Sequence, residues 1–148
     1  MIEYFNELGL LGLFSASFLA STIVPVSSEL VLFFLLYSGV SPLTCLVVAT
    51  IGNTLGGITT YYLGYLGNTT LIKKFTGISD DKLQKWYVFA DRKGKYLAFF
   101  SWLPFVGDVF MVLLGLLKSP KTITLFFMFI GKLIRYVVLI YSTNLILA

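Results

Sequence analysis

The sequence predicts an all-α integral membrane protein made of two inverted repeats, each a re-entrant helical hairpin followed by a transmembrane helix. Three observations lead to this fold class: long stretches without charge, a set of residues that recurs at a fixed interval, and one charged segment between the two occurrences. Hydrophobic residues make up 57% of the 148 residues and charged residues only 12%, well below the roughly 25% of a soluble domain. We expect a single membrane domain over residues 1–148.

The first repeat is predicted over about residues 8–67, where Glu29 is the only charged residue. The interrupted apolar segment Leu8–Gly39 is too long for one span of about 20 residues and too short for two spans with a turn. A re-entrant hairpin fits this length, and Leu43–Leu66 then supplies an uninterrupted span. No Lys or Arg precedes the first apolar stretch, so we expect the N-terminal segment to be retained rather than cleaved as a signal peptide.

Four residues recur 79 positions later without a gap. A proline is followed four residues later by an acid, and an Ile-Gly pair begins 22 residues after that acid. The first set is Pro25, Glu29, Ile51 and Gly52, and the second is Pro104, Asp108, Ile130 and Gly131. Because proline and acidic residues are rare in apolar segments, their joint recurrence indicates an internal duplication. Because proline kinks a helix, we interpret Pro25, and Pro104 with Gly107, as the turns of the two hairpins.

The second repeat is predicted over about residues 96–147, with an interrupted segment Tyr96–Leu117 and a span from about residue 122 to 147. The alternative is that Tyr96–Leu117 crosses the membrane as one full span. That alternative would put Lys118 and Lys121 on the outer side, against the positive-inside rule. The hairpin keeps both lysines in the cytoplasm and is the interpretation we prefer.

The segment between the repeats, residues 73–95, contains ten charged residues, seven of them basic. Its apolar residues Leu83, Trp86, Tyr87 and Ala90 follow helical spacing, which predicts an amphipathic helix on the membrane surface. Because no Lys or Arg precedes it, the positive-inside rule predicts that this linker is cytoplasmic and that both termini lie on the other side. A hairpin leaves the membrane on the side where it entered, so a hairpin plus one span crosses the membrane an odd number of times. The second repeat then begins on the opposite side from the first, and the two repeats must be inverted.

Charged residues within the apolar segments are the candidate site. An ionised carboxylate in the bilayer is costly unless paired, so we select Glu29 and Asp108, with Lys132 and Arg135 as their expected partners. Asn53 is expected to form a hydrogen bond with one of the acids. One interpretation is a midplane site, in which the acids bind protons or cations and Arg135 holds an anion such as phosphate. The other is a structural ion network that locks the halves together, and the sequence leaves both open.

Small residues mark the predicted spans. Gly52, Gly56 and Gly57 lie in the first span and Gly131 in the last. Small side chains let membrane helices approach closely, so we interpret these glycines as packing positions.

Several classes of function are not expected. The chain has no histidine and one cysteine, so we predict no metal, no cofactor and no intramolecular disulfide. No nucleophile with its base can be assembled. Two carboxylates could serve an intramembrane hydrolase, but an enzyme is the weaker class. The basic residues of the linker accompany no recognition module, which argues against nucleic acid.

Four motifs together resemble the DedA family of bacterial inner-membrane proteins, which share the VTT or SNARE-associated domain, and in particular its short YqaA-like branch. The motifs are Ser17–Thr22 leading to Pro25 and Ser28-Glu29, Gly52–Gly57, Ser101–Asp108 and Gly131–Tyr136. The resemblance covers nearly the whole chain. It implies opposed re-entrant hairpins, membrane-embedded acids and arginines needed for activity, and a role in envelope integrity.

The resemblance also implies a class of substrate. Some larger members are regarded as proton-linked transporters of a polyprenyl phosphate carrier, and more distant relatives move phospholipids between leaflets. The larger members have arginines at the positions of Ser101 and Gly107, so Arg135 is the one arginine left within the predicted spans of this chain.

The sequence therefore predicts a small, multi-pass, transporter-like protein of the bacterial inner membrane that moves or binds a lipid-linked or small charged solute. The expected partners are membrane lipids, protons and a lipid-linked phosphate, and the small size of one chain favours a homodimer. The alternative is a membrane-biogenesis or scaffold protein that transports nothing.

Overall fold

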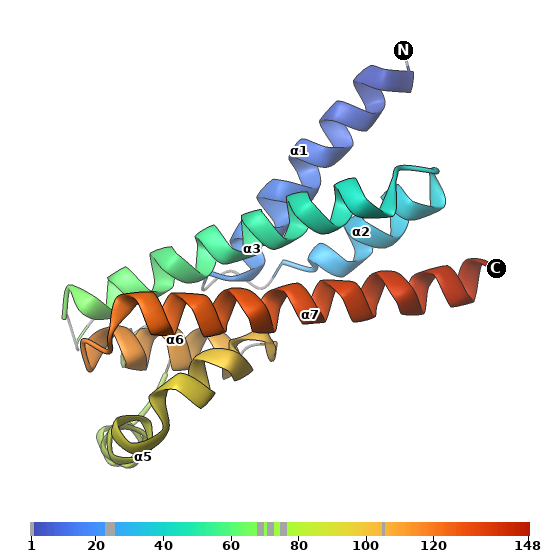
Figure 1. Ribbon diagram of the computed structural model, residues 1–148. Coiled ribbons are helices and arrows are strands. Elements are labelled where there is room, and N and C mark those ends of the chain that lie inside the picture. The colour runs from blue at the N-terminus through green and yellow to red at the C-terminus, as the bar shows by residue number, and fades with distance from the viewer. Residues whose placement is uncertain (1, 23–25, 68–69, 71–72, 75–76, 105) are drawn as a thin grey trace. The chain divides into compact units, whose positions relative to one another are not determined.

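A computed structural model describes residues 2–22, 26–67, 70, 73–74, 77–104 and 106–148 (Figure 1). The six α-helices of the described residues are α1 (Ile2–Ala20), α2 (Ser28–Tyr37), α3 (Pro42–Tyr65), α5 (Asp80–Phe99), α6 (Val106–Leu116) and α7 (Lys121–Leu147), and a 3₁₀ helix, η1, covers Phe100–Trp102. No strand occurs in the part of the chain that the structure describes. The predicted all-helical class is confirmed, while the turn predicted at Pro25 lies outside the described residues.

Two helices are long and apolar enough to cross a membrane, α3 with 24 residues and α7 with 27. At 1.5 Å per residue they measure about 36 and 40 Å, more than the roughly 30 Å of a bilayer core. Their ends agree within one residue with the spans predicted at 43–66 and 122–147. By contrast, α2 has 10 residues and α6 has 11, about 15 and 17 Å, which is about half of the bilayer core.

The turns after α2 and α6 share one backbone geometry, at positions 79 residues apart. In each turn the residue with positive φ donates its N–H to the carbonyl three residues back, and the next residue donates to the carbonyl five residues back. This is the Schellman motif that ends many helices. The bonds are Gly39 to Leu36 (3.1 Å) and Val40 to Leu35 (3.0 Å) in the first turn, and Lys118 to Gly115 (2.9 Å) and Ser119 to Leu114 (3.0 Å) in the second.

The chain forms two compact units, one from Met1–Gly56 with Lys132–Ala148 and the other from Gly57–Gly131. We call them unit 1 and unit 2. Each of the long helices α3 and α7 contributes to both units. Each unit has its own apolar core. Leu13, Leu32, Leu35, Cys45, Ala49 and Tyr136 are buried together in unit 1, and Tyr61, Ala90, Leu97, Phe110, Met111 and Met128 in unit 2.

In unit 1, glycines bring the backbone of α3 close to that of α1. A Cβ placed on Gly52 would lie 2.7 Å from the carbonyl oxygen of Phe14, and one on Gly56 would meet the carbonyl oxygen of Phe18. Glycine at these two positions is what permits the close approach.

In unit 2, the helix predicted between the repeats packs against α6. Leu83 and Ala90 of α5 are buried, and the ring centroids of Trp86 and Phe110 lie 5.3 Å apart. The helix also extends beyond the predicted segment 73–95, because it continues to Phe99 through a break in helical geometry at Lys93. The first part of the predicted interrupted segment is thus the end of α5.

Candidate functional site

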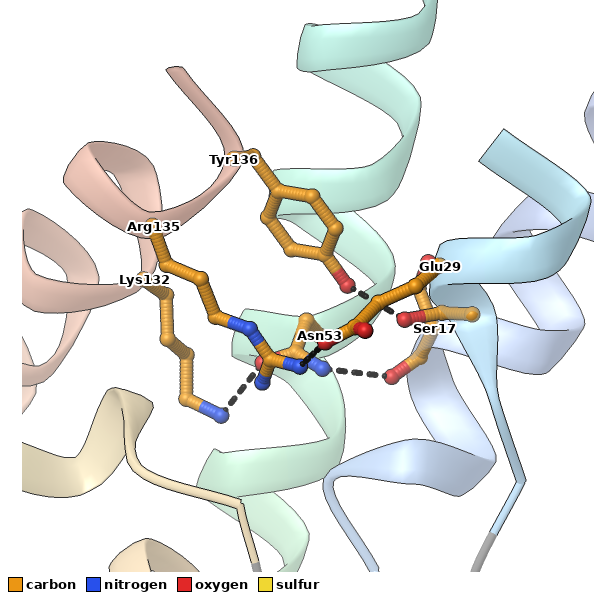
Figure 2. Close-up of polar contacts among 7 residues, drawn as sticks. Ser17, Glu29, Asn53, Lys132, Arg135 and Tyr136 are labelled. Atoms are coloured by element: carbon orange, nitrogen blue, oxygen red, sulfur yellow. Dashed lines mark hydrogen bonds and ion pairs between the residues drawn. The ribbon is translucent and has the colours of Figure 1, made fainter. Parts of the chain in front are cut away.

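One face of α7 carries three polar side chains of unit 1, Lys132, Arg135 and Tyr136 (Figure 2). Residues spaced by three and four positions lie on the same side of a helix, so these side chains point together toward α1, α2 and α3 of the same unit. They come from the motif Gly131–Tyr136 that the sequence singled out. The N-terminal part of the cluster is a buried lysine, and the next turn carries an ion pair.

Lys132 is only 1% exposed and is held by hydrogen bonds. Its Nζ donates to Asn53 Oδ1 at 2.6 Å and also to the hydroxyl of Ser21. The amide Nδ2 of Asn53 in turn donates to the carbonyl oxygen of Ser17 at 2.9 Å. Because a buried charge needs hydrogen-bond partners in a low-dielectric interior, this chain of bonds stabilises Lys132 among α1, α3 and α7.

Glu29 and Arg135 form an ion pair, with 2.5 Å between Oε1 and Nη2. The Glu29 side chain is 50% exposed while that of Arg135 is 15% exposed, so the pair joins an interior guanidinium to a carboxylate that is open to the surroundings. Glu29 lies in the first turn of α2, where the helix dipole stabilises a negative charge. The sequence named both residues as partners, and the structure brings them together.

A second bond fixes α2 against α7 beside the ion pair. The hydroxyls of Ser28 and Tyr136 lie 3.0 Å apart, and both residues are fully buried. This bond fixes the distance between the N-terminus of α2, which carries Glu29, and the α7 backbone. Neither residue was predicted as part of the site. The signal was weak, since a serine beside an acid is more readily interpreted as a helix cap.

Asp108 has the same local position in α6 as Glu29 has in α2, because both acids lie in the first turn of a short helix. Asp108 is partly buried and belongs to unit 2, whereas Glu29 belongs to unit 1. The backbone at Gly107 lies against that of Ser101, where a Cβ would meet the Ser101 carbonyl oxygen. Pro104 is exposed in the break before α6. That the two acids meet in one site stays a prediction.

The remaining glycines of the prediction are buried in helices. Gly57 is buried in α3, and Gly131 of α7 lies where a Cβ would meet the carbonyl oxygen of Phe99. Among the residues that the structure describes, no group of three or more metal-ligating side chains occurs.

Two helices long and apolar enough to cross a bilayer, with a buried lysine and an ion pair on one face of α7, indicate an all-helical membrane protein. Comparison with known proteins makes this specific. The chain is 35% identical over 139 residues to the inner membrane protein YqaA of Escherichia coli (strain K12), covering 93% of each chain. The same figures apply to the YqaA protein of Shigella flexneri. An uncharacterized protein of Haemophilus influenzae is 31% identical over 151 residues, 96% of this chain and 92% of that protein.

The chain therefore belongs to the family of the inner membrane protein YqaA, and the predicted location in the bacterial inner membrane is confirmed. No family model matches the chain. No solved structure matches it either.

Proposed function

We propose that the protein is a small carrier that moves or binds a lipid-linked or small charged solute together with protons, and thereby supports the cell envelope. The observation that carries this proposal is the Glu29–Arg135 pair, in which a half-exposed carboxylate is bonded to a largely buried guanidinium. We also propose that the YqaA family belongs to the larger DedA or VTT group, and that the protein is not an enzyme.

The chemistry of the pair supports an anionic solute. A guanidinium binds a carboxylate and a phosphate with the same fork of N–H donors. Glu29 and a phosphate would therefore compete for Arg135. Protonation of Glu29 removes its negative charge and releases Arg135 to the anion, and loss of that proton restores the ion pair and expels the anion. Lys132, three residues earlier on α7, adds a second positive charge on the same face.

We propose an inverted-repeat architecture with two re-entrant hairpins. Three features support it: α2 and α6 are too short to cross a bilayer, their terminal turns match 79 residues apart, and Asn53 is bonded to Lys132, the residue at its equivalent position. In a structure of two inverted repeats, equivalent residues contact one another near the axis that relates the repeats. In this architecture Asp108 is the counterpart of Glu29, and a second copy of the chain completes the pathway.

The architecture predicts the sides of the membrane on which the two matching turns lie. In a Cys45→Ser background, we expect Ser41→Cys and Thr122→Cys to react with a membrane-impermeant maleimide from opposite sides. Both native residues are exposed; Ser41 directly precedes α3 and Thr122 lies in the first turn of α7. Positive-inside topology puts residue 122 in the cytoplasm and residue 41 outside. If each interrupted segment crossed as one full span, both cysteines would react from the same side.

The proposed function is tested by lipid and proton movement in proteoliposomes at matched protein density. We expect wild type to move a fluorescent phospholipid or a polyprenyl phosphate together with protons, and Glu29→Gln and Asp108→Asn to lose that movement while remaining folded and monodisperse. The amides keep the shape of each acid and remove its charge. Absence of movement by wild type, with all three proteins folded, would contradict the carrier.

The second candidate is a scaffold in membrane biogenesis. The observation that favours it is that the bonds of Lys132, Arg135 and Tyr136 link α7 to α1, α2 and α3, as a structural lock would. The same variants separate the two functions. A scaffold predicts that Glu29→Gln lowers the amount of protein in the membrane, whereas a carrier predicts unchanged amount with lost movement.

A further inference from the structure

The turn between α6 and α7 contains a strained lysine. Lys118 has φ of 51° and is the only non-glycine residue with positive φ among the described residues. The matching turn after α2 has Gly39 at this position, with φ of 84°. Glycine adopts this conformation freely and an L side chain does not. A strained residue held by its surroundings points to a use for its side chain.

Tyrosines of α3 hold the lysines of this turn. The Nζ of Lys121 lies 4.5 Å from the ring centroid of Tyr65 and 5.2 Å from that of Tyr62. The Nζ of Lys118 lies 5.7 Å from the Tyr65 ring. These distances are within the range of about 6 Å for a cation–π contact. Both lysines are exposed, so their remaining N–H donors are open to a ligand.

The backbone of the turn is fixed as well. The buried hydroxyl of Tyr61 donates to the carbonyl oxygen of Ser119 at 2.5 Å. Gly94 of α5 packs on the same turn, where a Cβ would lie 3.0 Å from Leu114 and 3.7 Å from the hydroxyl of Ser119. The two ammonium groups are therefore presented at defined positions rather than on a loose loop.

The position and charge of this cluster identify its ligand. The turn lies where α7 begins, and the tyrosines lie where α3 ends, and both helices are candidate membrane spans. Tyrosines at such ends are typical of the membrane interface, at the level of lipid headgroups. No acidic residue follows Asp108 in the sequence, so the charge of this segment is wholly positive. Basic residues at this level attract anionic lipids.

We propose that Lys118 and Lys121, positioned by Tyr62 and Tyr65, bind the phosphate of an anionic phospholipid headgroup. This site consists of unit 2 residues only and does not depend on the function proposed for Glu29 and Arg135. The bound lipid would anchor the end of α3 and the beginning of α7 at one leaflet. Lysine binds phosphate through charge-assisted hydrogen bonds, and both lysines of this site contact the same ring, that of Tyr65.

The test uses the purified full-length protein in an uncharged detergent. The probes are short-chain phosphatidylglycerol, short-chain phosphatidylcholine and inorganic phosphate at equal concentration, and the measured quantity is the shift of the thermal unfolding midpoint. We expect phosphatidylglycerol to raise the midpoint of wild type and the other two probes to leave it unchanged. An equal shift with inorganic phosphate, or with phosphatidylcholine, would overturn the lipid headgroup site.

Two pairs of substitutions locate the effect. Lys118→Gly/Lys121→Gln should lose the shift, and its fold should survive because glycine removes the backbone strain at residue 118. Lys82→Gln/Lys85→Gln removes the same charge from exposed positions of α5 and should keep the shift. Equal loss in both pairs would show binding to overall charge and overturn the site. A shift retained by the Lys118→Gly/Lys121→Gln variant would overturn it as well.

Discussion

Substitution of Gly115 by leucine should strongly destabilise unit 2. Any Cβ at Gly115 would meet the backbone of α3, at the carbonyl oxygen of Tyr61 and 2.8 Å from the amide nitrogen of Tyr65. Gly64 makes the reverse contact, since its Cβ would meet the carbonyl oxygen of Val112 and lie 3.0 Å from Val112 Cα. Because backbone atoms cannot turn aside as a side chain can, the helices would have to separate.

Overpacking of this kind costs about 3 kcal/mol, and the separation would also break the Tyr61–Ser119 bond. The measurement is the thermal unfolding midpoint of the purified protein, together with the fraction that elutes as a single species. Gly12→Ala is the matched control. No atom lies within 4 Å of a Cβ at that position, and alanine favours the helix by about 0.5–1 kcal/mol. A midpoint for Gly115→Leu equal to that of the control would contradict the close contact of α3 and α6.

Changes to Glu29 and Arg135 should alter anion binding in opposite directions. In the proposed mechanism, Glu29 competes with the anion for the guanidinium of Arg135, to which it is bonded at 2.5 Å. Glu29→Gln removes the competing charge and should tighten binding of a phosphate-bearing lipid. Arg135→Gln removes the charged donors and should weaken binding by roughly 10- to 100-fold, since a hydrogen bond to a charged group contributes about 1.5–3 kcal/mol.

Farnesyl phosphate is a suitable probe, and its affinity can be measured by calorimetry in detergent, with farnesol as the uncharged control. If the pair is purely structural, each substitution removes one partner of the ion pair and should destabilise the protein to a similar extent. An equal loss of affinity for farnesyl phosphate in Glu29→Gln and Arg135→Gln would therefore favour the scaffold.

The two long helices and their ends could be predicted from the sequence because each depends on a local pattern. The spans of α3 and α7 were found within one residue, since an uninterrupted apolar run of this length has few alternatives. The recurrence of Pro, acid and Ile-Gly predicted two similar halves, and the turns at Gly39 and Lys118 do match. The extent of α5 was not predicted, because the linker was delimited by its charged residues, of which Lys95 is the last, whereas the helix continues through the apolar residues that follow to Phe99.

The partners within the site could be predicted only in part. The rarity of charged residues within apolar segments was enough to select Glu29, Arg135 and Lys132. It did not predict which of the two cations binds which oxygen atom. That choice depends on how α7 is rotated against helices about 80 to 110 residues earlier, which local pattern does not encode. The same holds for the bond of Ser28 to Tyr136 and for that of Lys132 to Ser21.

The central claim is that Glu29 and an anionic solute exchange at Arg135. The affinity of the Glu29→Gln variant for farnesyl phosphate, measured beside wild type on folded protein in the same detergent, tests this claim most directly. The account predicts that the variant binds more tightly than wild type, because the negative charge of Glu29 no longer competes with the anion for Arg135. Affinity equal to or lower than that of wild type would contradict it.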